Sequence, residues 1–184
     1  MIADTDADAV PGGEEVALTA EQRDAVRDNG RIELPNVRFD IDGALVRTEY
    51  HSPVERWELL CQFRIWEEVL RLHQRLHVLA IDRSGTGPMP PDRRRLMAEW
   101  DRRFGADVVA IVNDGNRVTN TMIGLLIRAM SMLRPKPLKV ALFTDEAAAR
   151  EWLSGAVREA RREGVPQSVP QSVHEGVPEG MHEG

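Results

Sequence analysis

The sequence predicts an α/β fold, a single domain built on a mixed, mostly parallel β-sheet. Short apolar runs with strand character alternate with helical stretches of ten or more residues. One tight hairpin precedes the first long helix, so the first two strands are expected to be antiparallel. A chain of 184 residues with 42% hydrophobic side chains is also long enough for one domain with tails.

The hairpin is predicted from two alternating runs, "NVRFDI" and "ALVRTEY". They flank Asp42-Gly43, a dipeptide that suits a tight turn between antiparallel strands. A long helical stretch then runs from Pro53 to about Leu76.

The remaining elements follow in strict alternation. "PPDRRRLMAEWDRRF" starts with Pro91 and Asp92, which favour the beginning of a helix. The last helix has acids at its start and arginines at its end, as the helix dipole favours. In chain order, the stretches after the long helix are "HVLAID", "PPDRRRLMAEWDRRF", "DVVAIV", "RVTNTMIGLLIRAMSML", "PLKVALF" and "DEAAAREWLSGAVREARR". The expected order is therefore ββαβαβαβα, with an N-terminal hairpin and four helices.

Three regions are expected along the chain. Residues 1–29 are acidic and lack a strong period, so we expect a mostly disordered tail with, at most, a short helix at 19–28. Residues 30–164 form the α/β domain. Residues 165–184 repeat tetrapeptides, from VPQS to MHEG, and such a unit cannot bury a core, so we expect a mobile tail.

The charge and cysteine content exclude several classes of protein. The ends are acidic, and residues 31–164 hold 22 basic and 19 acidic side chains. This small excess of positive charge argues against nucleic-acid binding, which favours a strongly basic surface. The one cysteine, Cys61, suits a reducing compartment, and the first residues do not read as a signal peptide. The most apolar window, "TMIGLLIRAMSML", is too short to cross a membrane. We expect a cytoplasmic protein without membrane contact.

Three stretches resemble a known family: "LAIDRSG", "VVAIVND" and "VALFTDEAAAREWL". In these stretches the chain resembles the STAS superfamily, specifically the SpoIIAA-like proteins related to bacterial anti-sigma-factor antagonists. The likeness covers roughly residues 31–155. It implies a bacterial STAS-like α/β domain that regulates by docking, and none of the three stretches is catalytic.

The resemblance also implies a phosphorylation switch, in which a kinase modifies a serine at the start of the helix after the central strand. In this chain no Ser or Thr occurs from Pro88 to Arg103, so the phosphoacceptor position of the family is missing. Ser84 and Thr86 are hydroxyls of the same loop, placed earlier, and are the candidates for phosphorylation.

The loop "DRSGTGPMPPD" does not have the spacing of a phosphate-binding motif. Its prolines also remove backbone N–H donors that a phosphate would need. Two interpretations stay open, a plain connection between strand and helix, and a stiff loop that docks a partner.

Any small ligand is expected where this loop meets the loop after the next strand, because both lie at the carboxyl edge of the sheet. Asp82 is expected to cap its loop, with catalysis as the less favoured alternative. The candidate residues of this partner or ligand site are Asp82, Arg83, Asn113, Asp114, Asn116 and Arg117.

Three consecutive arginines, Arg93, Arg94 and Arg95, lie in the first turn of the next helix, where the dipole disfavours cations. They form either a solvated face that pairs with Glu99 and Asp101, or a docking patch for an acidic surface. The acidic N-terminus of the chain itself is one such surface.

The long helix carries two apolar stripes, whereas a surface helix normally has one. One stripe suffices to cover a sheet. The second either packs under the tails or an adjacent helix, or forms a self-association face that makes a homodimer. The residues of this second stripe are Leu59, Phe63, Trp66 and Leu70.

The function expected from these observations is a non-enzymatic regulatory or scaffolding domain that binds an unidentified protein partner. A module that binds a small apolar molecule or lipid is the first alternative, and an enzyme using Asp82 is the second. We expect no catalytic residues, no metal site and no cofactor.

Overall fold

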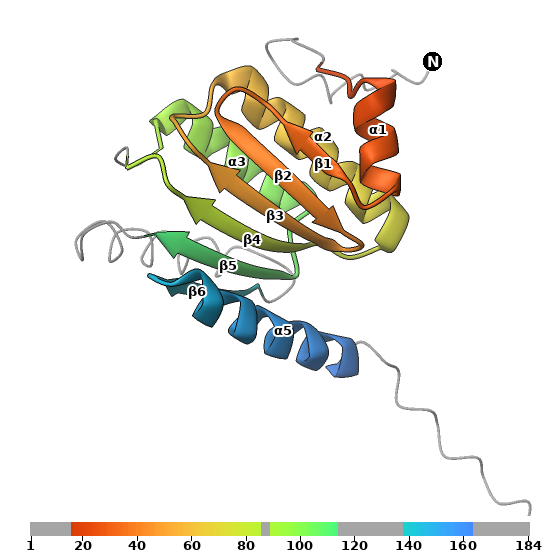
Figure 1. The fold of residues 1–184 in the computed structure, drawn as a ribbon, viewed down its shortest axis with the longest axis vertical. Coiled ribbons are helices and arrows are strands. Elements are labelled where there is room, and N and C mark those ends of the chain that lie inside the picture. The colour runs from red at the N-terminus through yellow and green to blue at the C-terminus, as the bar shows by residue number, and fades with distance from the viewer. Residues whose placement is uncertain (1–15, 86–88, 114–137, 164–184) are drawn as a thin grey trace, which may run out of the picture.

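The computed structural model describes residues 16–85, 89–113 and 138–163. These residues form an α/β fold with a six-stranded mixed sheet and four helices (Figure 1). The strands are β1 (Arg31–Glu33), β2 (Val37–Asp42), β3 (Leu45–Tyr50), β4 (His77–Asp82), β5 (Val108–Asn113) and β6 (Lys139–Phe143). The helices are α1 (Ala20–Arg27), α2 (Arg56–His73), α3 (Pro91–Arg103) and α5 (Glu146–Glu163).

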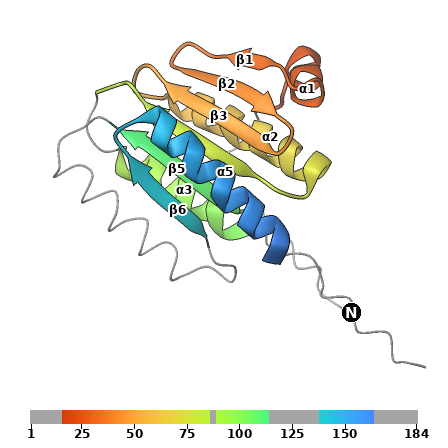
Figure 2. The same cartoon turned by 60° about the horizontal axis from the view of Figure 1, so that its bottom comes forward.

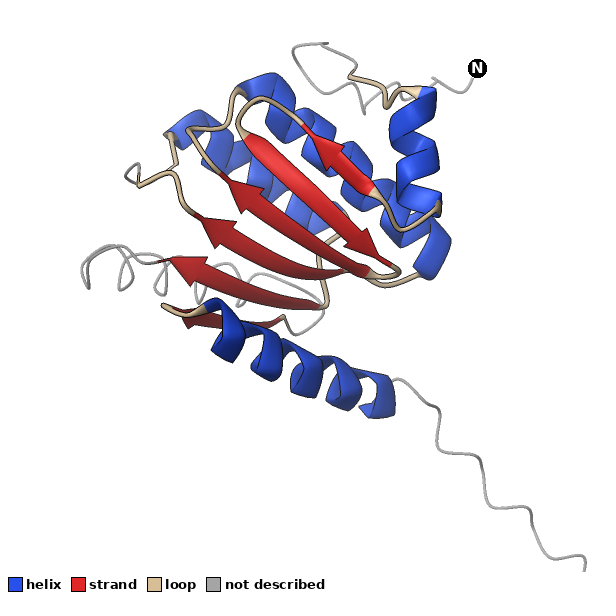
Figure 3. Cartoon of the chain, viewed as in Figure 1, coloured by secondary structure: helices blue, strands red, loops and turns tan. Residues whose placement is uncertain are grey.

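The strands lie side by side in chain order, from β1 to β6 (Figure 3). β1, β2 and β3 pair antiparallel, and β3, β4, β5 and β6 pair parallel. The predicted mixed sheet with its hairpin is confirmed, with one strand more than expected. β1 has three residues, too few for an alternating pattern to stand out in the sequence.

The hairpin turns where the sequence predicts it. Asp42 pairs with Leu45, so Gly43 and Ala44 form a two-residue loop. Gly43 adopts a φ of +56°, which glycine tolerates because it has no Cβ. Its backbone N–H donates to Asn29 Oδ1 at 2.6 Å, which ties the turn to the end of α1.

The region predicted as a mostly disordered N-terminal tail, residues 1–29, forms regular structure within its described part, residues 16–29. The short helix suggested at 19–28 forms as α1, and Thr19 and Gln22 cap it reciprocally at 2.9 and 3.1 Å. Val26 is fully buried in the core beside α2. Residues 1–15 lie outside the described residues, as does the repeat tail from residue 164 onward.

The second apolar stripe of α2 is buried, because α2 lies between the sheet and its neighbouring helices. Leu59, Phe63 and Trp66 are only 1%, 6% and 6% exposed, and Leu70 is partly buried against the same core. Phe63 stacks on Trp100 of α3 with ring centres 5.5 Å apart. The expectation of a self-association face at these four residues is therefore wrong, and the alternative of packing against an adjacent helix is confirmed.

α5 covers the opposite face of the sheet over its parallel half (Figure 2). Leu153 and Ala156 of α5 pack on Ile81 and Val108 in a second apolar cluster. Over β1, β2 and β3, no described helix covers this face (Figure 1). The polar side chains of these strands are therefore expected to lie on an open surface.

The helix predicted for "RVTNTMIGLLIRAMSML" falls outside the described residues. The other three predicted helices form as α2, α3 and α5. Among the helices that the structure describes, none combines the length and the apolar composition needed to cross a membrane.

Candidate functional site

Three polar side chains end neighbouring parallel strands in one row. Tyr50 closes β3, Asp82 closes β4 and Asn113 closes β5, and each is the register partner of the next. Register partners in a parallel sheet share a face, so all three lie on the α2 side of the carboxyl edge. The structure thus brings Asp82 and Asn113 together, as the sequence predicts.

Asp82 caps the loop that follows it. Its Oδ1 atom accepts hydrogen bonds from the backbone N–H of Ser84 at 2.9 Å and from the Ser84 hydroxyl at 2.5 Å. The expected loop-capping role is confirmed. The same contacts engage the hydroxyl of Ser84, the candidate phosphoacceptor in the described part of this loop.

Tyr50 joins this edge to α2. Its hydroxyl donates to Oε1 of Gln62 at 3.1 Å, and Gln62 is fully buried. Burial raises the pKa of Tyr50, the Gln62 hydrogen bond opposes that rise, and the nearby charge of Asp82 adds to it. The hydroxyl therefore stays protonated and acts as a fixed donor inside the edge.

Arg83, the next predicted residue, points to the other face of the sheet. Its Nε donates to Glu49 Oε1 at 2.7 Å, and its Nη2 donates to Glu146 Oε2 at 3.1 Å. Arg83 therefore belongs to the open sheet face rather than to the row of Asp82 and Asn113.

The open face of β1, β2 and β3 is covered by charges that alternate in sign. Arg31 pairs in register with Asp40, and Asp40 with Arg47; one step along, Glu33 pairs with Arg38, and Arg38 with Glu49. Opposite charges therefore meet both across the strands and along them. We call these six residues the charge lattice: Arg31, Glu33, Arg38, Asp40, Arg47 and Glu49.

Glu49 is the centre of the charge lattice. Its side chain is 6% exposed and accepts hydrogen bonds from Arg83, Arg47 and Arg38. Burial alone would raise the pKa of Glu49, but hydrogen bonds from Arg83 and Arg47, with the charges of Arg47 and Arg38, lower it to about 2. The carboxylate is therefore ionised throughout the neutral range.

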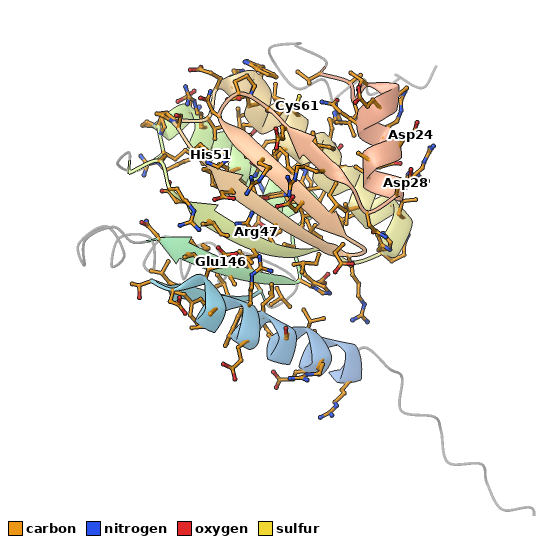
Figure 4. All side chains as sticks on the ribbon, in the orientation of Figure 1. Asp24, Asp28, Arg47, His51, Cys61 and Glu146 are labelled. Carbon is orange, nitrogen blue, oxygen red and sulfur yellow. The ribbon has the colours of Figure 1, made fainter. Side chains whose placement is uncertain are left out.

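Arg47 connects the lattice to α5. Its side chain is 13% exposed and donates to Glu49 at 2.8 Å, to Asp40 at 3.1 Å and to Glu146 at 3.1 Å. Figure 4 shows Arg47 on the sheet and Glu146 at the start of α5. Burial alone would lower the pKa of Arg47, but the hydrogen bonds to Glu146 and Glu49 raise it above its ordinary value. These contacts dock the first turn of α5.

The predicted basic patch on α3 divides into two kinds of arginine. Arg93 donates through Nη1 to the carbonyl oxygen of Val54, and its Nη2 lies 3.6 Å from Glu55. Arg93 thus anchors α3 to the start of α2. Arg94 and Arg95 are exposed, and neither forms an ion pair within the described part of the chain. The expected pairing of these two with Glu99 and Asp101 is not present there.

Arg102 and Arg103, near the end of α3, are also exposed and without an ion pair among the described residues. Arg95 and Arg102 are seven positions apart, about two helical turns, so they lie on one side of α3. That side is opposite Trp100, which is 5% exposed and faces α2. We call Arg94, Arg95, Arg102 and Arg103 the α3 arginines.

Four of the predicted site residues lie outside the described residues: Thr86, Asp114, Asn116 and Arg117. In the ranges that the structure describes, no group of three or more His, Cys, Asp or Glu side chains could hold a metal ion.

The charge lattice was missed by reasoning from the sequence. The sequence does contain the pattern that predicts it, since outward positions of "VRFDID" and "LVRTEY" carry Arg, Asp, Arg and Glu. The hairpin register brings these opposite charges together, so the pairing follows once the turn at Gly43 is placed.

Comparison with known proteins assigns no relative. No family model matches the chain, and neither a curated protein nor a solved structure matches it. The proposals below therefore rest on the contacts, burial and charges of the described residues.

Proposed function

We propose that this chain is a non-enzymatic regulatory domain of STAS-like fold that binds an acidic protein surface through the α3 arginines. The observation that carries the proposal is their exposure without an ion pair among the described residues. Arginine is favoured in such interfaces because its planar group binds carboxylates through two parallel hydrogen bonds.

The position of Arg94 has no benefit for the isolated helix. Arg94 is in the first turn of α3, where the helix dipole makes a cation unfavourable by about 0.3–1 kcal/mol. At Arg47 and Arg83, by contrast, the arginine side chain contacts carboxylates of the fold. A binding partner that supplies carboxylates would give the α3 arginines ion pairs like those that Arg47 and Arg83 form within the fold.

α3 is also held rigidly enough to act as a docking surface. Trp100 stacks on Phe63, and its Nε1 donates to Glu67 Oε1 at 3.1 Å. Arg93 fixes the other end of the helix. A surface that is ordered before binding loses little entropy when a partner arrives.

The likeness to STAS proteins supports the same location. It implies that the loop after the central strand, and the helix that it begins, meet the partner. Here these are the loop after Asp82 and α3. The hydrogen bonds of Asp82 to Ser84 assign that carboxylate to loop structure, which favours docking over the alternative of catalysis by Asp82.

The test is affinity capture from bacterial extract with the full chain and two charge-reversal variants. Arg95→Glu with Arg102→Glu changes the outward side of α3. Arg158→Glu with Arg162→Glu makes the same change of charge on exposed positions of α5. Circular dichroism confirms that each variant is folded before capture.

We expect proteins with acidic surfaces that are captured by the wild type and by the α5 variant, and at least tenfold less by the α3 variant. The loss should be mimicked by raising the salt concentration, because exposed charges are screened. Equal capture by all three proteins would refute a role for the α3 arginines.

A further inference from the structure

We propose that the acidic N-terminal segment, residues 1–15, binds the α3 arginines of the same chain and competes with the acidic partner. This inference deepens the proposed function, on which the competition rests. The contact within the chain can be tested without any partner.

The charges of the two surfaces are complementary. Residues 1–15 contain no Lys or Arg, and α3 exposes four arginines. Within the described part of the chain no carboxylate pairs with these arginines. The acidic residues of the segment are Asp4, Asp6, Asp8, Glu14 and Glu15.

The described chain begins on α2, the helix against which α3 packs. The carbonyl oxygen of Val16 accepts a hydrogen bond from Arg64 Nε at 3.3 Å, so the chain lies on α2 at this point. Arg64 in turn donates to Glu67 at 2.8 Å, and Glu67 accepts from Trp100 of α3 at 3.1 Å. A chain of hydrogen bonds therefore leads from Val16 across α2 to Trp100, on the side of α3 that faces α2.

The start of the described chain is also held in place. Leu18 is 8% exposed and packs in the main core. Residues 1–15 are therefore joined to a fixed point on α2, the helix that packs against α3. A short tether holds two groups at an effective concentration of the order of millimolar, so individually weak ion pairs suffice for binding.

The segment is long enough to reach the whole helix. Fifteen residues in extended form span up to about 50 Å. The 13 residues of α3 are about 20 Å long. Both pairs of arginines, at the start and at the end of α3, are within that reach.

The acidic C-terminal tail is a less suitable occupant. It has three acids and no basic residue, but it continues from α5, on the opposite face of the sheet from α2 and α3 (Figure 2). The N-terminal segment starts on α2, which contacts α3 directly.

The experiment is nuclear magnetic resonance of the ¹⁵N-labelled full chain. The test variant neutralises the segment with Asp4→Asn, Asp6→Asn, Asp8→Asn, Glu14→Gln and Glu15→Gln. The matched control neutralises the C-terminal tail with Glu175→Gln, Glu179→Gln and Glu183→Gln.

We expect the test variant to shift the backbone amides of residues 94–103 and the Nε–H signals of the α3 arginines. Wild type in about 0.5 M NaCl should move towards the same positions, because the Debye length then falls to a few ångströms. The control should leave α3 unchanged. Unchanged α3 signals in the test variant would overturn the inference, and so would shifts produced by the tail control instead.

The competition is measured separately by capture. We expect the neutralised N-terminal variant to capture roughly twofold to tenfold more of the acidic partner than the wild type does. Equal capture would overturn the competition even where the α3 arginines prove necessary for binding. A failure to capture any partner would count against the proposed function alone, because the resonance experiment reads only the contact within the chain.

Discussion

Two groups of arginines in this molecule have opposite surroundings. Arg38, Arg47 and Arg83 on the open sheet face each contact one or more carboxylates. The α3 arginines contact none in the part of the chain that the structure describes. The same residue type therefore supports the fold in one region and is left available for binding in the other.

The difference arises from the geometry of the two elements. Neighbouring strands bring side chains to about 5 Å from one another in a fixed register, so alternating charges meet without further adjustment. On α3 an acid is present at Glu99, four positions after Arg95 and four before Arg103, yet neither pair forms. An exposed pair on a helix gains only about 0.3–0.5 kcal/mol, which does not hold long side chains in one conformation.

The largest effect is expected from Glu49→Gln. The substitution leaves Arg47, which is largely buried, without its central carboxylate, and we expect the free energy of unfolding to fall by about 2–4 kcal/mol. Urea denaturation at pH 7 measures this. A loss below about 0.5 kcal/mol would show that the charge lattice contributes no more than an ordinary surface pair.

Lowering the pH should reduce the free energy of unfolding through the same ion pairs of the charge lattice. The folded-state pKa of Glu49 is about 2, below its ordinary 4.5. The contribution of the ionised Glu49 to the free energy of unfolding is therefore complete above pH 4.5 and is lost as the pH falls through 2. The pKa values of Asp40 and Glu146 are also lowered, despite burial, by their arginine partners. Wild type should lose stability between pH 5 and 2, and its advantage over Glu49→Gln should narrow over the same interval. An advantage that stays constant down to pH 2 would contradict this account.

A smaller effect of opposite sign is expected from Arg94→Glu. The substitution replaces a cation by an anion in the first turn of α3, so we expect the free energy of unfolding to rise by about 0.3–1 kcal/mol. Arg162→Glu in the last turn of α5 makes the same change at the other end of a helix and should lower stability by a similar amount. Thermal unfolding of both variants tests whether the first substitution stabilises the protein and the second destabilises it. A marked loss of stability in Arg94→Glu would show that this arginine supports the fold.

The smallest effect is expected from Glu159→Gln. Glu159 lies 3.1 Å from Lys139, but its side chain is 65% exposed, so we expect a loss of no more than about 0.5 kcal/mol. This loss should disappear in about 1 M NaCl, whereas most of the Glu49→Gln loss should persist. Equal salt sensitivity of the two variants would remove the distinction between lattice and surface pairs.

Much of the fold could be predicted from local pattern. Alternation over six residues predicts β2 and β3, and Gly43 predicts the turn between them, because these signals depend on neighbours in sequence. β1 was missed because three residues do not make a period. The candidate site was predicted in part, since strand ends that are adjacent in a parallel sheet bring Asp82 and Asn113 together.

Other properties required the tertiary structure. The sequence by itself determined the α/β alternation, the hairpin and the acidic ends, because periodicity and composition are local. Only the tertiary structure decided that Phe63 and Trp66 face Trp100 rather than solvent, since an apolar stripe is the same whether a helix or a second molecule covers it. It likewise decided that Arg47 pairs with Glu146, because these two residues are 99 positions apart in the chain.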